Sequence, residues 1–130
     1  MDVSPEMILH LNRRIRDLSL DNVRTILSPP DDPLLPAASV DLVFICDTWH
    51  HIDQRPHYLA LLRKVLRSGG QIAIVDYQKQ DTPGGPPMDM RLSREDVQKE
   101  FEQGGFRMVK EHSFLPYQYF VVFAPAPKPK

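Results

Sequence analysis

The sequence has little cysteine, little net charge and no long hydrophobic run. Its 130 residues include one cysteine, Cys46, so an internal disulfide and a zinc ribbon are both excluded. The formal net charge of −1 disfavours nucleic-acid binding through a basic face. No segment reaches the roughly 18 apolar residues of a membrane span, and the N-terminus lacks the basic and apolar regions of a signal peptide. We therefore expect a cytoplasmic protein with neither nucleic acid nor membrane as a partner.

Glycine is absent from the first half of the chain, where proline is abundant. All six glycines lie at or after residue 69, and most of the 13 prolines fall in three clusters, at residues 29–36, 83–87 and 125–129. Because proline and glycine mark connections, the segments between these clusters are expected to be the helices and strands. The length suits one domain, which we place at residues 1–125, with a mobile tail at 126–130.

The pattern of apolar residues predicts an α/β fold. Ser4 and Ser93 are expected to cap helices at 4–18 and 93–103, and a third helix at 55–67 is expected to end at Ser68-Gly69-Gly70. Near-continuous apolar runs predict buried parallel strands at 40–46 and 71–77, and further strands are expected at 22–27, 106–115 and 118–124. The link Pro116-Tyr117 is too short for a parallel crossover, so the last two strands are expected to form an antiparallel hairpin.

Three segments, taken in order, resemble a known family. They are residues 39–52, residues 66–76 with the Gly69-Gly70 turn, and the Gly104-Gly105-Phe106 turn with the later residues 115–120. Their order and spacing resemble the class I S-adenosylmethionine-dependent methyltransferases, nearest the small-molecule group that includes the ubiquinone-biosynthesis type. Ser68 stands where that family usually has proline. The resemblance implies a Rossmann-like, mostly parallel sheet with a terminal hairpin, S-adenosylmethionine as cofactor, and a small-molecule methyl acceptor.

The resemblance also implies that part of the domain is missing. The family begins with a strand and a Gly-rich loop that approaches the cofactor, whereas residues 1–7 resemble the end of its second strand. The chain is thus expected to be an N-terminally truncated domain without its first strand, with an exposed edge on the 40–46 strand through which copies self-associate. Two interpretations remain open: a methyltransferase, with the activity of these residues alone unresolved, or a non-catalytic remnant or binding module.

For cofactor binding, the resemblance implies a set of residues at the ends of strands. Asp2 would accept hydrogen bonds from the ribose hydroxyls, and Asp31 and Asp32 would lie near the adenine amino group, although both also suit a turn. The loop after the 40–46 strand would border the methionine part of the cofactor and the acceptor; its candidates are Asp47, Thr48 and Trp49.

His50 and His51 follow in the same loop and are the candidate catalytic bases. Methyl transfer needs a base only where the acceptor must lose a proton, and histidine can take one near neutral pH. Alternatively, one histidine packs under the next helix while the other hydrogen-bonds the loop. No zinc-binding spacing is present, so we predict no metal. The absence of Asn/Asp-Pro-Pro-Tyr/Phe disfavours amino-directed methylation, and the absence of Tyr-x-x-x-Lys disfavours a short-chain dehydrogenase.

Three further expectations concern the surroundings of this loop. Asp76 and Tyr77 end the 71–77 strand and would border the acceptor, although both also suit a turn at the strand end. The long segment 78–91 would be either a lid over the acceptor or a disordered loop. Cys46 is expected to pack in the core.

Overall fold

The computed structural model describes residues 1–127 and contains one four-stranded sheet. The strands are β1 (Val40–Cys46), β2 (Leu66–Tyr77), β3 (Phe106–His112) and β4 (Gln118–Pro125), arranged in the order β1-β2-β4-β3. β1 and β2 are parallel, whereas β4 is antiparallel to both β2 and β3. The predicted parallel pair and terminal hairpin are therefore confirmed. Part of the predicted tail, residues 128–130, lies outside the described residues.

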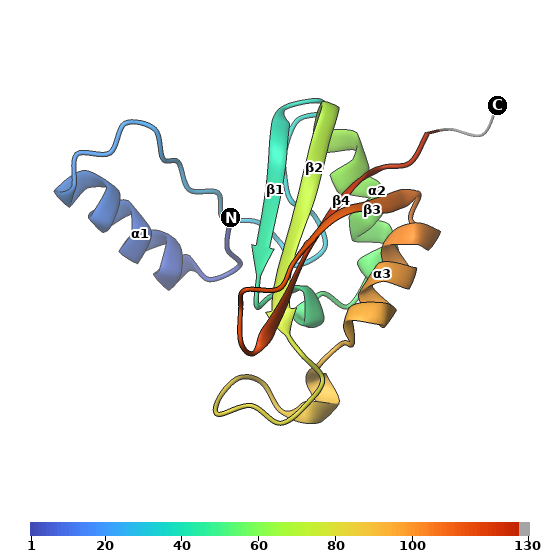
Figure 1. Ribbon diagram of the computed structural model, residues 1–130. Coiled ribbons are helices and arrows are strands. Elements are labelled where there is room, and N and C mark those ends of the chain that lie inside the picture. The colour runs from blue at the N-terminus through green and yellow to red at the C-terminus, as the bar shows by residue number, and fades with distance from the viewer. Residues whose placement is uncertain (128–130) are drawn as a thin grey trace.

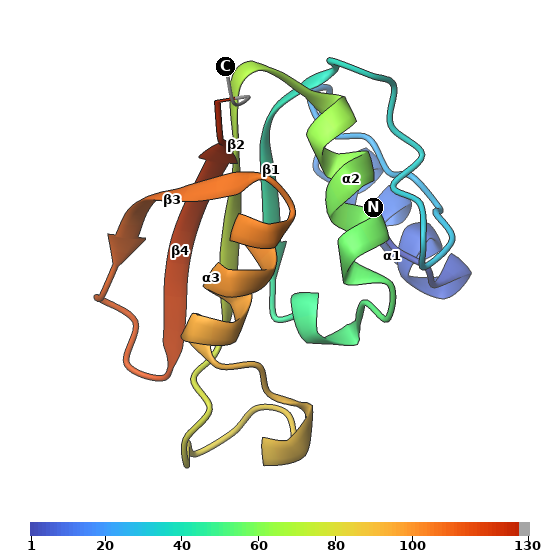
Figure 2. The ribbon, with the colours of Figure 1, turned by 90° about the vertical axis from the view of Figure 1, so that its right-hand side faces the viewer.

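Two helices cover one face of this sheet. They are α2 (Arg55–Val65) and α3 (Arg94–Gln103), which lie on the same side of the strands in both views (Figures 1 and 2). The first helix, α1 (Pro5–Asp17), lies with the N-terminal segment on the other side, beyond β1 (Figure 1). Short 3-10 turns follow β1 at Trp49–His51 and precede α3 at Met88–Met90.

The core lies between the sheet and its two covering helices. Phe101 of α3 stacks on Phe123 of β4 with ring centroids 4.0 Å apart, and it also contacts Trp49 at 5.1 Å and Phe106 at 5.6 Å. Aromatic pairs at such separations add to the free energy of burying their surface. These contacts join α3, both strands of the hairpin and the turn after β1 into one cluster. The other fully buried members are Leu59, Leu62, Ile72, Ile74, Val97 and Val121.

The helix caps are confirmed, but some boundaries differ from the predictions. The hydroxyls of Ser4 and Ser93 accept backbone N–H bonds at the starts of α1 and α3. α2 ends at Val65 and β2 starts at once at Leu66, five residues earlier than expected, because Leu66 pairs with Val40 across a register shift. β3 ends at His112 rather than at residue 115, since its pairing with β4 stops at the His112–Phe120 pair.

The N-terminal segment is far less well packed than the rest. Residues 22–27 do not form the expected strand, which is a correction; they contribute one isolated parallel bridge, between Asp2 and Leu27. A strand needs a neighbour along its length, whereas residues 22–27 pair with the chain only at Asp2. α1 has apolar residues at helical spacing, yet none of its residues is buried. No helix within residues 1–127 is long and apolar enough to cross a membrane.

Candidate functional site

The chemically distinctive side chains lie where the parallel strands β1 and β2 end. Asp47 leaves β1 with a left-handed backbone (φ +50°), and its N–H donates to the Val75 carbonyl at 2.8 Å. Aspartate tolerates this conformation better than most residues. The Asp47 carboxylate accepts hydrogen bonds from the Gln118 side-chain amide at 2.9 and 3.1 Å. The turn after β1 is thereby joined to the start of β4.

His50 and Asp76 form a buried pair at this edge. His50 Nδ1 lies 3.0 and 2.9 Å from the two carboxylate oxygens of Asp76, and the side chains are only 2% and 3% exposed. The Asp76 carboxylate also accepts the backbone N–H groups of His50 and Tyr77. A carboxylate can only accept here, so Nδ1 carries the proton and Nε2 of the neutral ring keeps its lone pair. Asp76 therefore fixes both the orientation and the tautomer of His50.

The other members of the turn have different surroundings. The Trp49 ring is fully buried among the core aromatics, and its Nε1–H donates to Glu100 at 3.1 Å. Glu100 is also held by the Arg55 guanidinium, with the shortest contact at 2.8 Å. These contacts fix the turn against α3 and so hold His50 in place. His51 is exposed, and its ring lies 4.1 Å from that of His50, centroid to centroid.

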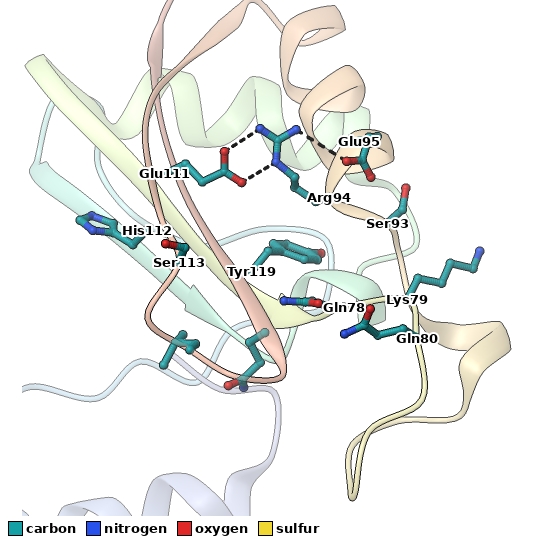
Figure 3. A pocket seen from close by; sticks show the side chains of 12 residues that line it. Gln78, Lys79, Gln80, Ser93, Arg94, Glu95, Glu111, His112, Ser113 and Tyr119 are labelled. Atoms are coloured by element: carbon teal, nitrogen blue, oxygen red, sulfur yellow. Dashed lines mark hydrogen bonds and ion pairs between the residues drawn. The ribbon is translucent and has the colours of Figure 1, made fainter.

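A polar pocket of about 380 Å³ opens beside this edge (Figure 3). Its walls are residues 78–80 after β2, residues 93–95 at the start of α3, and the β3–β4 hairpin. Figure 3 shows Gln78 and Gln80 on one wall and the Arg94–Glu111 pair on the opposite one. Gln118, which holds Asp47, also lines the pocket. This contact connects the pocket with the turn that carries His50.

Arg94 forms the ion pairs of the polar pocket, with Glu111 at 2.6 Å and with Glu95 at 3.8 Å. The hydrogen bonds from Arg94 lower the pKa of Glu111 below its usual range, so this carboxylate stays charged. Tyr119, by contrast, is buried; desolvation, with a smaller contribution from the charge of Asp76, raises the pKa of its hydroxyl. Its hydroxyl donates to the Leu92 carbonyl at 3.4 Å. The pocket thus presents amides and fixed charges, with a neutral phenol on its inner side.

A second pocket, also about 380 Å³, lies along the free edge of β1. We call it the open-edge pocket; residues 1–3 and Pro29-Pro30 form one rim, and residues 43–46 with Thr48, Ile52, Tyr58 and Leu62 form the other. Asp2 supplies its carboxylate, whose Oδ1 already accepts the Ser4 N–H at 2.9 Å. The remaining lining is largely apolar.

The structure therefore separates the candidates for cofactor binding. Asp2 and Thr48 share the open-edge pocket, where the Thr48 hydroxyl donates to the Cys46 carbonyl. Asp31 and Asp32 are outside its lining, and Asp32 accepts the Leu34 N–H at 2.8 Å within a turn. Asp47 is bound by Gln118 and Trp49 by Glu100, so neither faces this pocket.

Cys46 was expected in the core, and this prediction is wrong. Its position in β1 alternates with the buried Val43 and half-buried Ile45, which places it on the exposed face of the strand. Desolvation and the adjacent Asp47 carboxylate raise the pKa of the thiol, so it is protonated at neutral pH. Within residues 1–127 no three His, Cys, Asp or Glu side chains gather closely enough to hold a metal ion.

Sequence reasoning missed the residues that position the turn after β1. Gln118 and Glu100 lie 71 and 51 residues from their partners Asp47 and Trp49. Neither has a local motif. The available signal was the Pro116-Tyr117 link, which places the start of β4 next to the end of β3; the pairing that brings Gln118 to the end of β2 has no local signal.

Comparison with known proteins gives consistent results. A family model described as "Methyltransferase domain" matches residues 1–74. The 27-O-demethylrifamycin SV methyltransferase of Amycolatopsis mediterranei is 29% identical over 97 residues, which are 73% of this chain and 35% of that protein. A SAM-dependent methyltransferase from Aquifex aeolicus matches with a TM-score of 0.88 and 27% identity, covering 94% of this chain and 65% of that one.

A putative type 11 methyltransferase from Sulfolobus solfataricus superposes with a TM-score of 0.76 and 25% identity, covering 93% of this chain and 68% of that one. The chain therefore spans about a third of the curated relative, 35%, and just under two thirds, 65%, of the first solved structure. The Aquifex match covers nearly all of this chain, so both the sheet and most of the N-terminal segment have counterparts there.

Proposed function

This chain belongs to the methyltransferase domain family. We therefore propose that it takes part in the transfer of a methyl group from S-adenosylmethionine to a hydroxyl group of a small molecule. S-adenosylmethionine is the cofactor that membership of this family implies. The observation that carries the proposal is the His50–Asp76 pair at the carboxyl edge of the parallel strands, in the turn that the Asp47–Gln118 contact joins to the polar pocket. Ligands of open α/β sheets bind at this edge.

The residues of the open-edge pocket fit the nucleoside part of S-adenosylmethionine better than its methionine part. The open-edge pocket offers the Asp2 carboxylate for ribose hydroxyls, Thr48, and an apolar wall against which a nucleoside can pack. No glycine lines it; Gly69 and Gly70 lie near the start of β2, at the opposite end of that strand from Asp76. The methionine part therefore has no backbone cradle among the described residues. When bound, the cofactor supplies a methyl group on a positively charged sulfur.

The chain's own residues supply proton removal on the acceptor side. A hydroxyl that gains a methyl group must lose its proton, and Nε2 of His50 is the nitrogen free to take it. The Asp76 carboxylate then stabilises the imidazolium through Nδ1. The His50 side chain is only 2% exposed and the His51 ring lies 4.1 Å from it, so at most a small part of His50 is accessible to an acceptor. This narrow access favours a small hydroxyl-bearing group.

The polar pocket supports a hydroxylated acceptor. Gln78, Gln80 and Gln118 provide amide donors and acceptors, and Lys79 adds a positive charge at the rim. The Amycolatopsis relative is named as the methyltransferase of 27-O-demethylrifamycin SV, a name that points to an oxygen atom as acceptor. A cytoplasmic location is supported by the single cysteine of the chain.

Transfer of labelled methyl groups tests this proposal. The purified chain is incubated with millimolar S-adenosylmethionine and a panel of phenols and hydroxylated macrocycles. We expect slow transfer to at least one compound, reduced about 100-fold in His50→Gln because a general base is lost. The control His57→Gln changes an exposed histidine of α2 outside both pockets and should retain wild-type transfer. Equal rates in the wild type and His50→Gln would contradict the proposal.

A second candidate function is that of a non-catalytic module that pairs with another copy of itself through β1. Leu42 and Phe44 on this edge are 57% and 59% exposed, although they belong to a sheet strand. Asp47 N–H points to β2, so by alternation the backbone groups of Leu42 and Phe44 point outwards. A second copy offers the same edge, which can pair across a two-fold axis. We expect Phe44→Lys to shift the chain toward monomer in light scattering, whereas a monomeric wild type would contradict this candidate.

A further inference from the structure

The segment between β2 and α3 is closed around one arginine. In Figure 1 this segment projects beyond the lower end of the sheet. Arg91 is only 7% exposed and its guanidinium binds four backbone carbonyls. Nε donates to Pro86 at 2.8 Å, one terminal nitrogen donates to Gln78 at 3.1 Å and Gln80 at 2.7 Å, and the other donates to Gly84 at 3.2 Å. The carbonyls come from the start and the middle of the segment, and Arg91 itself lies near its end.

The same arginine packs against the last residue of β2. Its guanidinium carbon lies 5.3 Å from the centre of the Tyr77 ring, a distance at which a cation is attracted to an aromatic face. Gly85 closes over the ring with φ +106°, and a Cβ there would lie 2.7 Å from the ring carbons. The segment is therefore anchored to the sheet as well as closed on itself, and the expected alternative of a disordered loop does not describe it.

Burial of a guanidinium is costly unless its N–H groups are bonded. Arg91 forms no ion pair among the described side chains, so the four carbonyl dipoles are what compensates its charge. Arginine has five N–H donors in a rigid planar fork, and four are used here. Lysine has one nitrogen and cannot bond all four carbonyls at once. The closed form of the segment therefore depends on this side chain.

We propose that Arg91 is a positioning residue that holds residues 78–80 in place as one wall of the polar pocket. Two of the four carbonyls, those of Gln78 and Gln80, belong to this wall and flank Lys79. The wall is thus formed before any ligand enters, and its position sets the width of the pocket. Only the identification of the pocket as the acceptor site rests on the proposed function.

Limited trypsin digestion tests the proposal without any activity measurement. Lys79 is exposed, but the backbone on both sides of it is held, so the Lys79–Gln80 bond is expected to resist cleavage. Arg91→Met removes the four bonds and also a competing trypsin site. We expect cleavage after Lys79 to become at least about tenfold faster, because proteolysis follows the population of the open segment. Arg91→Lys should be intermediate.

Two further variants show whether a change in cleavage comes from the closed segment itself. Arg67→Met, which changes an exposed arginine near the other end of β2, should leave cleavage at Lys79 unchanged. Gly85→Val should loosen the segment without altering Arg91, since its side chain would collide with Tyr77. The proposal would be overturned if trypsin cut the wild type and Arg91→Met equally fast after Lys79 and both chains unfolded at the same urea concentration. If cleavage responds but the acceptor KM does not, the positioning role stands and the acceptor assignment fails.

Discussion

The half of the molecule that α2 and α3 cover and the open half that contains α1 carry the same local helix signals, but they differ in how well their side chains are buried. In the covered half, α2 and α3 lie on one face of the sheet and bury Leu59, Val97 and Phe101. In the open half, α1 lies beyond the free edge of β1, and this amphipathic helix buries none of its residues.

The comparison teaches that local signals and packing are separate requirements. α1 and α3 are both capped by a serine and both have apolar residues at helical spacing. Only α3 faces a surface that can receive its apolar side. The two pockets differ in the same way, because every wall of the polar pocket comes from the covered half, whereas one rim of the open-edge pocket is formed by residues 1–3 and Pro29-Pro30 of the open half.

The largest expected effect is a difference between the two halves in how much a truncated apolar side chain lowers the free energy of unfolding. Phe101→Ala should lower the free energy of unfolding by about 3–5 kcal/mol, because Phe101 contacts three other buried aromatic rings. Leu11→Ala on α1 should cost at most about 1 kcal/mol. Urea unfolding of both variants measures this directly, and equal losses would show that α1 is as well packed as α3.

A smaller difference is expected between two aspartates. Asp76→Ala leaves His50 Nδ1 and two backbone N–H groups without their acceptor, so unfolding should become easier by about 2–3 kcal/mol. Asp41→Ala removes an exposed ion pair with Arg67 at the edge of the open half and should cost about 0–0.5 kcal/mol. Thermal unfolding at neutral pH compares the two variants, and a larger loss for Asp41→Ala would contradict the importance given to the buried pair.

The smallest expected effect is the pH dependence of the stability that the Arg94–Glu111 pair contributes. The hydrogen bonds from Arg94 lower the folded-state pKa of Glu111, so the pair stabilises the fold fully above the ordinary glutamate pKa. That contribution is lost as the pH falls through the lowered pKa. NMR titration should therefore find Glu111 below the usual glutamate range in the wild type and within it in Arg94→Met. An unchanged titration curve would show that the pair does not form.

Much of the covered half could be predicted from sequence, because its signals are local. Ser93 marked the start of α3, as Ser4 marked the start of α1 in the open half, and the Pro116-Tyr117 link marked the hairpin. The strand expected at 22–27 was wrong because strand formation depends on neighbours that no local pattern reveals. For the same reason the sequence identified His50 as a candidate but did not predict its pairing with Asp76, 26 residues away. The role of Arg91 depends on carbonyls that any residue type could supply.

The central claim is that the helix-covered half forms the acceptor side of the site, whereas the cofactor side lacks a glycine cradle among the described residues. Isothermal titration of the 130-residue chain with S-adenosylmethionine tests it most directly. Because no glycine cradle lines the open-edge pocket, several directed contacts of about 1 kcal/mol each are lost. We predict a Kd no tighter than about 1 mM. Binding at about 1 μM, abolished by Asp2→Ala, would show that this pocket already holds the cofactor and would contradict the account.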